Sequence, residues 1–397
     1  MKGTKNKRMR YYALCMMHCA LCMVLSGCIE EFEADIPSED SDLLVVEGTI
    51  SSGKLNKFVL SRTQTVNSSD TPRMVTGATV SVHGSDGSSY LTQANDGYYS
   101  CWIDVLSPDV EYYLHIEADG EVYESEPQKP LRTEKITEVQ GVQDTPESSI
   151  DVLITPDAPF EPDKVNYYSW TCDETWEVHS DYTTSLFFDK EAMKPVFKAD
   201  QFPNCGWKDS TGPAAMVGTS TNYEGQHIQK LKMYDISRGD RRVYYRYSGL
   251  VHQRAISKAE YEYELARRQA SSEMGGLFTP QPSALPTNIR CLTSRKHVIG
   301  FVGCSLNTSE YRFFLNPKDY SIQYPLGDAR FWLKDCSEAD CCLMVDKGMY
   351  LCIWEDNRIS GGVLNTAWAY EYQLDVRFKN VYLKEPEFWS LQENVRY

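Results

Sequence analysis

Long apolar runs are absent from this chain after its first 25 residues, so no later segment offers the ~20 apolar residues that a membrane-spanning helix needs. Basic residues are scarce too, because 40 lysines and arginines stand against 56 aspartates and glutamates, for a net charge of −16. A surface this acidic repels nucleic acid, and no basic cluster with interleaved aromatics offsets it. We therefore expect no nucleic-acid partner.

The motifs of several common active sites and metal centres are missing as well. No G-x-S-x-G nucleophile elbow, His-Glu-x-x-His zinc helix, glycine-rich phosphate loop or calcium loop occurs, and the seven histidines are scattered. Carboxylates are so numerous that choosing any two as a glycosidase pair would be arbitrary. The sequence therefore predicts no catalytic residue, no metal ligand and no cofactor, and it favours a non-enzymatic protein over an enzyme.

The N-terminus has the three parts of a bacterial lipoprotein signal at residues 1–27. Five basic residues with no acidic residue among them precede an apolar stretch of roughly 15 residues, which is too short to span a bilayer. The stretch ends in Leu25-Ser26-Gly27-Cys28, which resembles the lipobox where signal peptidase cuts and diacylglycerol joins the cysteine thiol. We therefore predict cleavage before Cys28 and attachment to a membrane through lipid on Cys28.

Residues 28–42 read as an acidic tether between the lipid and the folded part of the chain. They hold seven aspartates and glutamates, together with Pro37 and serines, and have little to bury. This composition suits a solvated linker, and it also resembles the surface-export signal of Bacteroidota lipoproteins, which implies exposure on the outer membrane. Signal cleavage removes five positive charges, so the mature net charge is −16 − 5 = −21, and we expect a neutral or cationic cargo.

Nine cysteines remain in the mature chain besides Cys28, an odd number that leaves at least one thiol unpaired or paired between molecules. Export permits disulfides, but the sequence does not reveal their pairing. The group at 336–342 has no second pair of close ligands, so disulfide or buried thiol is favoured over zinc, and we expect at least one of its cysteines to be oxidised. The nine are Cys101, Cys172, Cys205, Cys291, Cys304, Cys336, Cys341, Cys342 and Cys352.

The spacing of apolar runs and turns predicts a mainly β protein. Between residues 43 and 132, six or seven short strands separated by tight turns suggest an immunoglobulin-like β-sandwich that folds alone. Residues 133–397 predict a larger β-rich domain. Apolar and polar residues alternate at 168–178 and at 368–378, which is typical of strands with one buried face.

One main helix interrupts the β pattern of the larger domain. Ser257 and Glu260 have the spacing of a capping box, no helix breaker follows up to residue 273, and Gly275-Gly276 end the helix. A proline-rich segment follows it. We take the helix and this segment as the candidate contact region for a partner, the alternative being that they only cap the sheet.

Short motifs in a fixed order run through nearly all of the mature chain. They include Leu44-Val45-Val46-Glu47-Gly48, Gly97-Tyr98-Tyr99, Tyr167-Tyr168-Ser169-Trp170, Ile256-Ser257-Lys258-Ala259-Glu260-Tyr261 and Pro386-Glu387-Phe388-Trp389. Together they resemble a family of Bacteroidota lipoproteins, domain of unknown function 4249. The resemblance implies no catalytic residues and a setting similar to the accessory lipoproteins encoded beside TonB-dependent transporters. A ligand-capturing partner of such a transporter is the first functional expectation, and an adhesive or glycan-binding surface module is the alternative.

Cys28→Ala should abolish acylation and release the protein from membranes, because acyl chains at ~0.8 kcal/mol per buried methylene are its only predicted anchor. Membrane fractionation after growth with a labelled fatty acid measures both effects. A variant that stays labelled and membrane-bound would place the anchor elsewhere.

Overall fold

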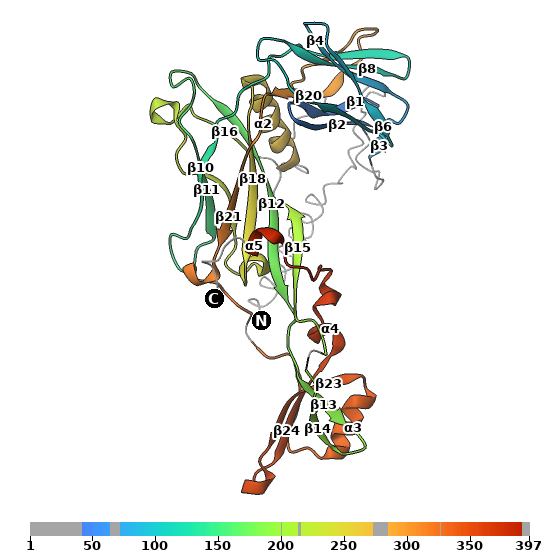
Figure 1. The fold of residues 1–397 in the computed structure, drawn as a ribbon, viewed down its shortest axis with the longest axis vertical. Coiled ribbons are helices and arrows are strands. Elements are labelled where there is room, and N and C mark those ends of the chain that lie inside the picture. Colours follow the sequence, from blue (N-terminus) through green and yellow to red (C-terminus); the bar gives the residue numbers. More distant parts are fainter. Residues whose placement is uncertain are drawn as a thin grey trace, which may run out of the picture.

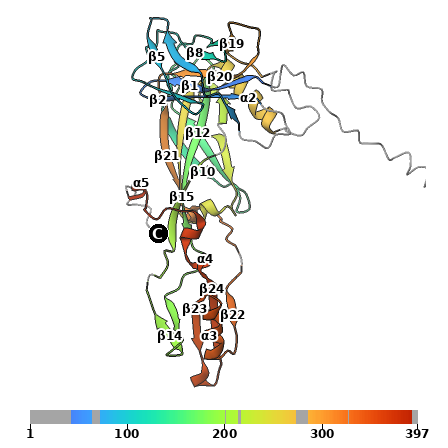
Figure 2. The same ribbon diagram turned by 90° about the vertical axis from the view of Figure 1, so that its right-hand side faces the viewer.

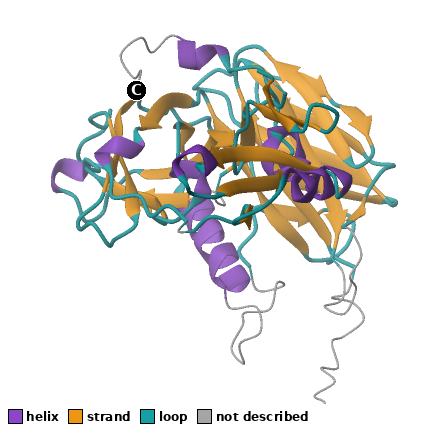
Figure 3. Ribbon diagram, turned by 90° about the horizontal axis from the view of Figure 1, so that it is seen from below, coloured by secondary structure: helices purple, strands orange, loops and turns teal. Residues whose placement is uncertain are grey.

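Three bodies follow one another along the long axis of the computed structural model (Figure 1). Each has its own buried core: an N-terminal sandwich around Phe58 and Leu114, a central body around Trp170, and a distal lobe around Phe188 and Trp368. Strands dominate and helices are few (Figure 3), which confirms the predicted mainly β class. The structure describes residues 42–63, 72–199, 201–212, 216–272, 285–325 and 327–390.

The N-terminal sandwich consists of two sheets. One has the strand order β20-β1-β2-β7-β6, with β3 beside β2, and the other has the order β19-β9-β8-β4-β5. In β8, every second side chain is buried, because alternate residues of a strand face opposite sides of a sheet. The strands are β1 Leu44–Ser51, β2 Lys54–Arg62, β3 Arg73–Met74, β4 Thr79–Gly84, β5 Ser89–Leu91, β6 Gln93–Asn95, β7 Tyr98–Ile103, β8 Tyr112–Ala118, β9 Glu121–Ser125, β19 Ile289–Cys291 and β20 Val298–Ser305.

Two strands of the sandwich come from far along the chain, which corrects the predicted boundary at residue 132. Strand β20 pairs in parallel with β1 over the full length of both, from Leu44 opposite Val298 to Ser51 opposite Ser305. Strand β19 pairs with β9. Val298 and Val302 of β20 are also part of the sandwich core. Residues 43–132 therefore lack one end strand of each sheet and part of the core, and the expectation that they fold alone loses its basis.

The central body packs a sheet of order β15-β12-β18-β21, with β16 beside β12, against the sheet β10-β11-β17. The predicted stripe on β12 is confirmed, because Tyr168, Trp170, Cys172 and Trp176 are all buried. Strand β12 has 13 residues and runs from the central body toward the distal lobe (Figures 1 and 2). The elements are β10 Ile136–Val142, β11 Ile150–Pro156, β12 Tyr167–His179, β15 Cys205–Thr211, β16 Met216–Thr219, η2 Glu224–Gln226, β17 Leu231–Ile236, η3 Arg241–Val243, β18 Tyr247–Ala255, α2 Lys258–Ser272, β21 Ser309–Leu315 and η5 Pro317–Asp319.

The predicted helix is present as α2, at the joint between the sandwich and the central body. Ser257 caps it as expected, since its hydroxyl accepts from the Glu260 N–H at 3.1 Å. The Glu260 carboxylate, however, pairs with Arg254 of β18 instead of closing the capping box. On the sandwich side, the ring of Tyr263 packs against Phe301 of β20. This packing favours the alternative that α2 caps the sheets, while most of the proline-rich segment lies outside the described residues.

The strand predicted at 368–378 is wrong in its second half. In the distal lobe, strand β24 ends at Tyr370 instead of Phe378. The Gln373 side chain accepts from the Tyr370 N–H, and the turns that follow leave Tyr372 and Phe378 55% and 58% exposed. The alternation at 368–378 therefore spans a strand and two short helices, in which Asp375 caps the second. The elements are β13 Leu186–Asp189, β14 Lys194–Phe197, β22 Phe331–Leu333, α3 Glu338–Asp346, β23 Met349–Asp356, η6 Arg358–Ser360, β24 Leu364–Tyr370, α4 Glu371–Leu374 and η7 Val376–Lys379. The chain then returns to the central body, where Trp389 of α5 Glu387–Ser390 packs against Trp207 of β15 and Phe314 of β21.

None of the helices within the described ranges combines the length and the apolar character needed to cross a bilayer.

Gly300→Ala should destabilise the sandwich. Gly300 has φ +127°, and a Cβ there would lie 1.9 Å from the carbonyl oxygen of Val46 on β1. The strain and the clash together should cost roughly 3 kcal/mol or more. Differential scanning calorimetry of the full chain should show an unfolding transition at lower temperature. Gly77→Ala is the matched control, because a Cβ at Gly77 meets nothing within 4 Å. Equal melting of the two variants would contradict the pairing of β1 with β20.

Candidate functional site

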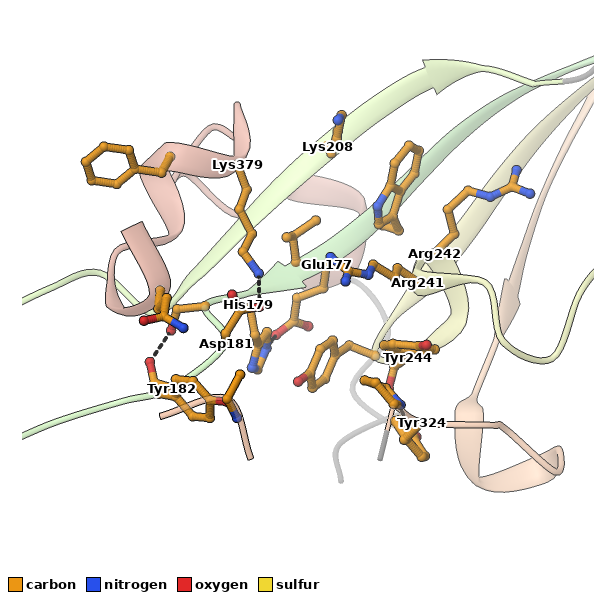
Figure 4. Close-up of a pocket in the computed structure, with 18 of the residues that line it drawn as sticks. Glu177, His179, Asp181, Tyr182, Lys208, Arg241, Arg242, Tyr244, Tyr324 and Lys379 are labelled. Atoms are coloured by element: carbon orange, nitrogen blue, oxygen red, sulfur yellow. Dashed lines mark hydrogen bonds and ion pairs between the residues drawn. The ribbon is translucent and has the colours of Figure 1, made fainter. Parts of the chain in front are cut away.

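A cleft of about 1280 Å³ lies between the central body and the distal lobe (Figure 4). Its wall includes the end of β12 and the residues that follow it, together with the segment before β18 and the turns α4 and η7. The lining residues fall mainly in the ranges 176–182, 240–245, 324–329 and 372–379. The cleft therefore exists because segments far apart in the sequence meet where β12 leaves the central body.

Tyrosines form much of the wall of this cleft. The rings of Tyr244 and Tyr324 lie 5.2 Å apart, and the Tyr324 hydroxyl donates to the Tyr244 carbonyl oxygen at 3.2 Å. Tyr324, Tyr372 and Phe378 are 49%, 55% and 58% exposed. Large ring faces are thus held in place and remain open to solvent, an arrangement that suits a ligand with flat apolar faces.

The charges that line the cleft are balanced, unlike those of the whole chain. Lys379 pairs with Asp181 at 2.7 Å, and Arg242 pairs with Asp240 at 2.8 Å. The exposed Lys208 has no ionic partner among the described residues. The expectation of a neutral or cationic cargo rested on the net charge of the chain, and the cleft itself does not impose it. Its cations are Lys208, Arg241, Arg242 and Lys379, and its anions are Glu177, Asp181, Asp240 and Asp328.

A buried carboxylate lies behind the cleft, on the core face of β12. Glu174 is only 2% exposed, and Arg242 Nη1 donates to both of its carboxylate oxygens at 2.7 Å. The Tyr247 hydroxyl donates to the same carboxylate, and burial raises the pKa of Tyr247 far above its usual value, so this phenol stays a donor. The buried Glu174 carboxylate therefore depends on the Arg242 guanidinium for compensation.

Three potential metal ligands meet at the edge of the cleft, on β12 and β15. His179 pairs directly with Cys205 in the register of the two strands, and Glu177 lies two residues before His179. His179 Nε2 lies 2.5 Å from Glu177 Oε1, and the Cys205 thiol donates to the same oxygen at 3.2 Å. Arg246 Nε donates to the other oxygen of Glu177 at 2.5 Å. We refer to Glu177, His179 and Cys205 as the β12–β15 cluster.

The protonation states in this cluster are not those of a site in which Cys205 acts as a nucleophile. Burial raises the pKa of Cys205 to about 12, and the neighbouring Glu177 adds to the shift. An activated cysteine has a lowered pKa and a histidine as its base, whereas Cys205 donates to a carboxylate. Burial alone would raise the pKa of Glu177, but the hydrogen bonds from His179 and Arg246 hold it at about 2. The free cluster thus holds a neutral thiol beside an ionised carboxylate.

Sequence reasoning did not find this cluster. Glu177 and His179 are two residues apart on a recognisable strand, which was a usable signal, but the position of Cys205 depends on a pairing that the sequence does not specify. The predicted lipidation site, Cys28, lies outside the described residues. The structure holds all nine other mature cysteines as free thiols. In the group at 336–342, burial and then the neighbouring Cys336 raise the pKa of Cys341 to about 12.

A comparison with protein families matches residues 29–311 to the family described as Domain of unknown function (DUF4249). The chain belongs to this family. Comparison with curated proteins finds no match. The DUF4249 region holds all the sandwich strands, the central body up to the start of β21, and the whole β12–β15 cluster. The cleft walls at 324–329 and 372–379 lie beyond it. The family match therefore covers one side of the cleft.

Arg242→Met should destabilise the protein by ~3–5 kcal/mol, because it leaves the Glu174 carboxylate buried without a cation. Adding Glu174→Gln to this variant should recover most of the loss, since no charge then stays buried. Urea unfolding of the full chain measures both effects. Arg241→Met, an exposed neighbour, serves as the control and should change stability by less than ~0.5 kcal/mol. If the double variant is as unstable as Arg242→Met, the Glu174 charge is not the cause.

Proposed function

We propose that this DUF4249 protein is a non-enzymatic lipoprotein of the outer membrane, anchored through lipid on Cys28 and exposed at the cell surface. In this proposal it captures a ligand in the cleft and delivers it to a TonB-dependent transporter. The observation that carries the proposal is the cleft itself. Its volume of about 1280 Å³ exceeds the ~300–1,000 Å³ of typical small-ligand sites, so it has room for an extended ligand.

The arrangement of the three bodies supports a role at a membrane surface. Strand β1 begins at Leu44, directly after the tether, so the sandwich is the body nearest to the predicted anchor. The residues that line the cleft lie where the central body meets the distal lobe, and Figure 1 shows the distal lobe at the opposite end of the molecule from the sandwich. The tether at 28–42 can extend to at most about 50 Å at ~3.3 Å per residue. Together, these features would present the cleft away from the anchor, within reach of a neighbouring membrane protein.

The exposed rings in the cleft favour the second candidate function, a glycan-binding or adhesive surface module without a transport role. Tyr324, Tyr372 and Phe378 offer open ring faces of the kind on which sugar rings stack. Lys208 and Arg241 lie in the same cleft and could add polar contacts. Both candidates use the same cleft, so they differ in the partner and not in the site.

Affinity purification from mild-detergent membranes at native expression tests the transporter proposal. The full-length chain should enrich an outer-membrane TonB-dependent transporter over an untagged control, as measured by mass spectrometry. Recovery of the lipoprotein without such a transporter would contradict this proposal and leave the glycan-binding candidate.

Affinity electrophoresis in gels containing polysaccharide tests the second candidate. If ring stacking contributes ~0.5–1.5 kcal/mol for each ring, the double variant Tyr324→Ala/Tyr372→Ala should weaken binding roughly 5- to 150-fold. Trp102→Ala is the matched control, because Trp102 is 58% exposed but lies on β7 of the sandwich. Equal mobility of the wild type in gels with and without any polysaccharide would rule out this candidate.

A further inference from the structure

We propose that the β12–β15 cluster binds one zinc ion, with Glu177 Oε1, His179 Nε2 and Cys205 Sγ as its ligands. The ligand atoms of these three residues all lie within 4.8 Å of one another. A carboxylate, an imidazole and a thiolate are each common zinc ligands, and three protein ligands with one open position form a known class of zinc site. The inference is independent of the ligand that the cleft captures.

The backbone of two paired strands brings the ligands together. Glu177 and His179 are two residues apart on β12, so their side chains leave the same face of the sheet. Cys205 on β15 is the direct antiparallel partner of His179, and directly opposed residues also share a face. The strand ladder, and not a loop, therefore fixes the spacing of all three donors.

Further contacts hold two of the ligands in place. The ring of Tyr245 stacks on His179, with ring centres 3.7 Å apart and planes at 9°. Arg246 binds the second oxygen of Glu177 at 2.5 Å and is itself paired with Glu385 at 2.7 Å. The oxygen that faces His179 and Cys205 is thereby aimed at the centre of the cluster. Outer contacts of this kind orient the ligands of metal sites.

Metal binding requires only a small movement of the cluster. Donors bound to a tetrahedral zinc at ~2.0–2.3 Å are about 3.3–3.6 Å apart. The present separations are 2.5 Å between His179 and Glu177 and 3.2 Å between Cys205 and Glu177. These two pairs must therefore spread by less than about 1 Å, and the third pair, His179 and Cys205, lies within 4.8 Å. The His179 side chain is 33% exposed, so a metal ion can reach its ring from solvent.

The charge balance of the reaction is favourable. Zinc replaces the proton on the Cys205 thiol, which leaves to solvent, and binds the ionised Glu177. It also binds Nε2 of the His179 ring, whose proton moves to Nδ1 by exchange with solvent. The cluster with a thiol carries one negative charge, whereas the zinc complex with a carboxylate and a thiolate carries none. Ions bound to thiolates hold them deprotonated, so the metal itself supplies the driving force for losing this proton.

The fourth coordination position would face the cleft. Glu177 and His179 both line the cleft (Figure 4), whereas Cys205 is not one of its lining residues. A water molecule or a donor group of a captured ligand could complete the tetrahedron from that side. A metal bound here would thus be accessible to ligands in the cleft.

Titration of the full-length chain in detergent with Co²⁺, followed by Zn²⁺, tests the site. Cobalt bound to a cysteine thiolate should give a charge-transfer absorption band in the near ultraviolet. Zinc should then displace cobalt with a stoichiometry of one, because it binds nitrogen and sulfur sites more tightly. Cys205→Ser should remove the band. It should also weaken zinc binding by more than the roughly 10- to 100-fold that loss of an outer contact costs.

Two controls keep the outcome specific. Cys291→Ser removes a similarly half-buried thiol from the sandwich and should leave the cobalt band unchanged. Tyr245→Ala, which removes only the ring stacked on His179, should weaken zinc binding roughly 10- to 100-fold. Bound zinc should also slow the alkylation of Cys205 but not of Cys291, as read by peptide mass spectrometry. A wild-type chain without the band, or a band that persists in Cys205→Ser, would falsify the zinc site.

Discussion

The centre of the molecule depends on the need to compensate the charge of two buried carboxylates on β12. Glu174 faces the core and Glu177 faces the opposite side, because residues three apart on a strand point in opposite directions. A carboxylate removed from water needs a cation, and one short segment before β18 supplies both, as Arg242 and Arg246. This segment must therefore stay close to β12 along its whole length.

The same segment builds much of the cleft. Between its two arginines lie Tyr244 and Tyr245, of which the first contacts the ring of Tyr324 in the cleft wall and the second stacks on His179. Charge compensation within the central body thus also places the aromatic wall and fixes one ligand of the proposed zinc site. A substitution of Arg242 or Arg246 would therefore also displace the rings of Tyr244 and Tyr245 in the cleft wall.

Much of the local structure could be predicted from the sequence, because local patterns determine it. The stripe at 168–176 identified β12, and Ser257 identified the start of α2. The strand expected at 368–378 failed because the alternation continues where Gln373 and Asp375 turn the chain through side-chain hydrogen bonds. The alternation of apolar and polar residues carries no information about such capping hydrogen bonds.

The features that depend on distant pairing were beyond sequence reasoning. Nothing local in β20 shows that it pairs with β1, since its eight residues are all buried and would suit any inner strand. The β12–β15 cluster depends in the same way on which residue lies opposite His179. A shift of one position in that register would turn Cys205 to the other face of the sheet.

The insertion of β20 also constrains how the chain is made. Leu44 emerges first, but its partner Val298 follows 298 − 44 = 254 residues later. At ~5–20 residues per second, that delay is roughly 10–50 s, during which β1 presents an unpaired edge. Such an edge invites pairing with other chains, and contacts between distant residues form slowly. The sandwich therefore cannot close until the chain has been made as far as Ser305.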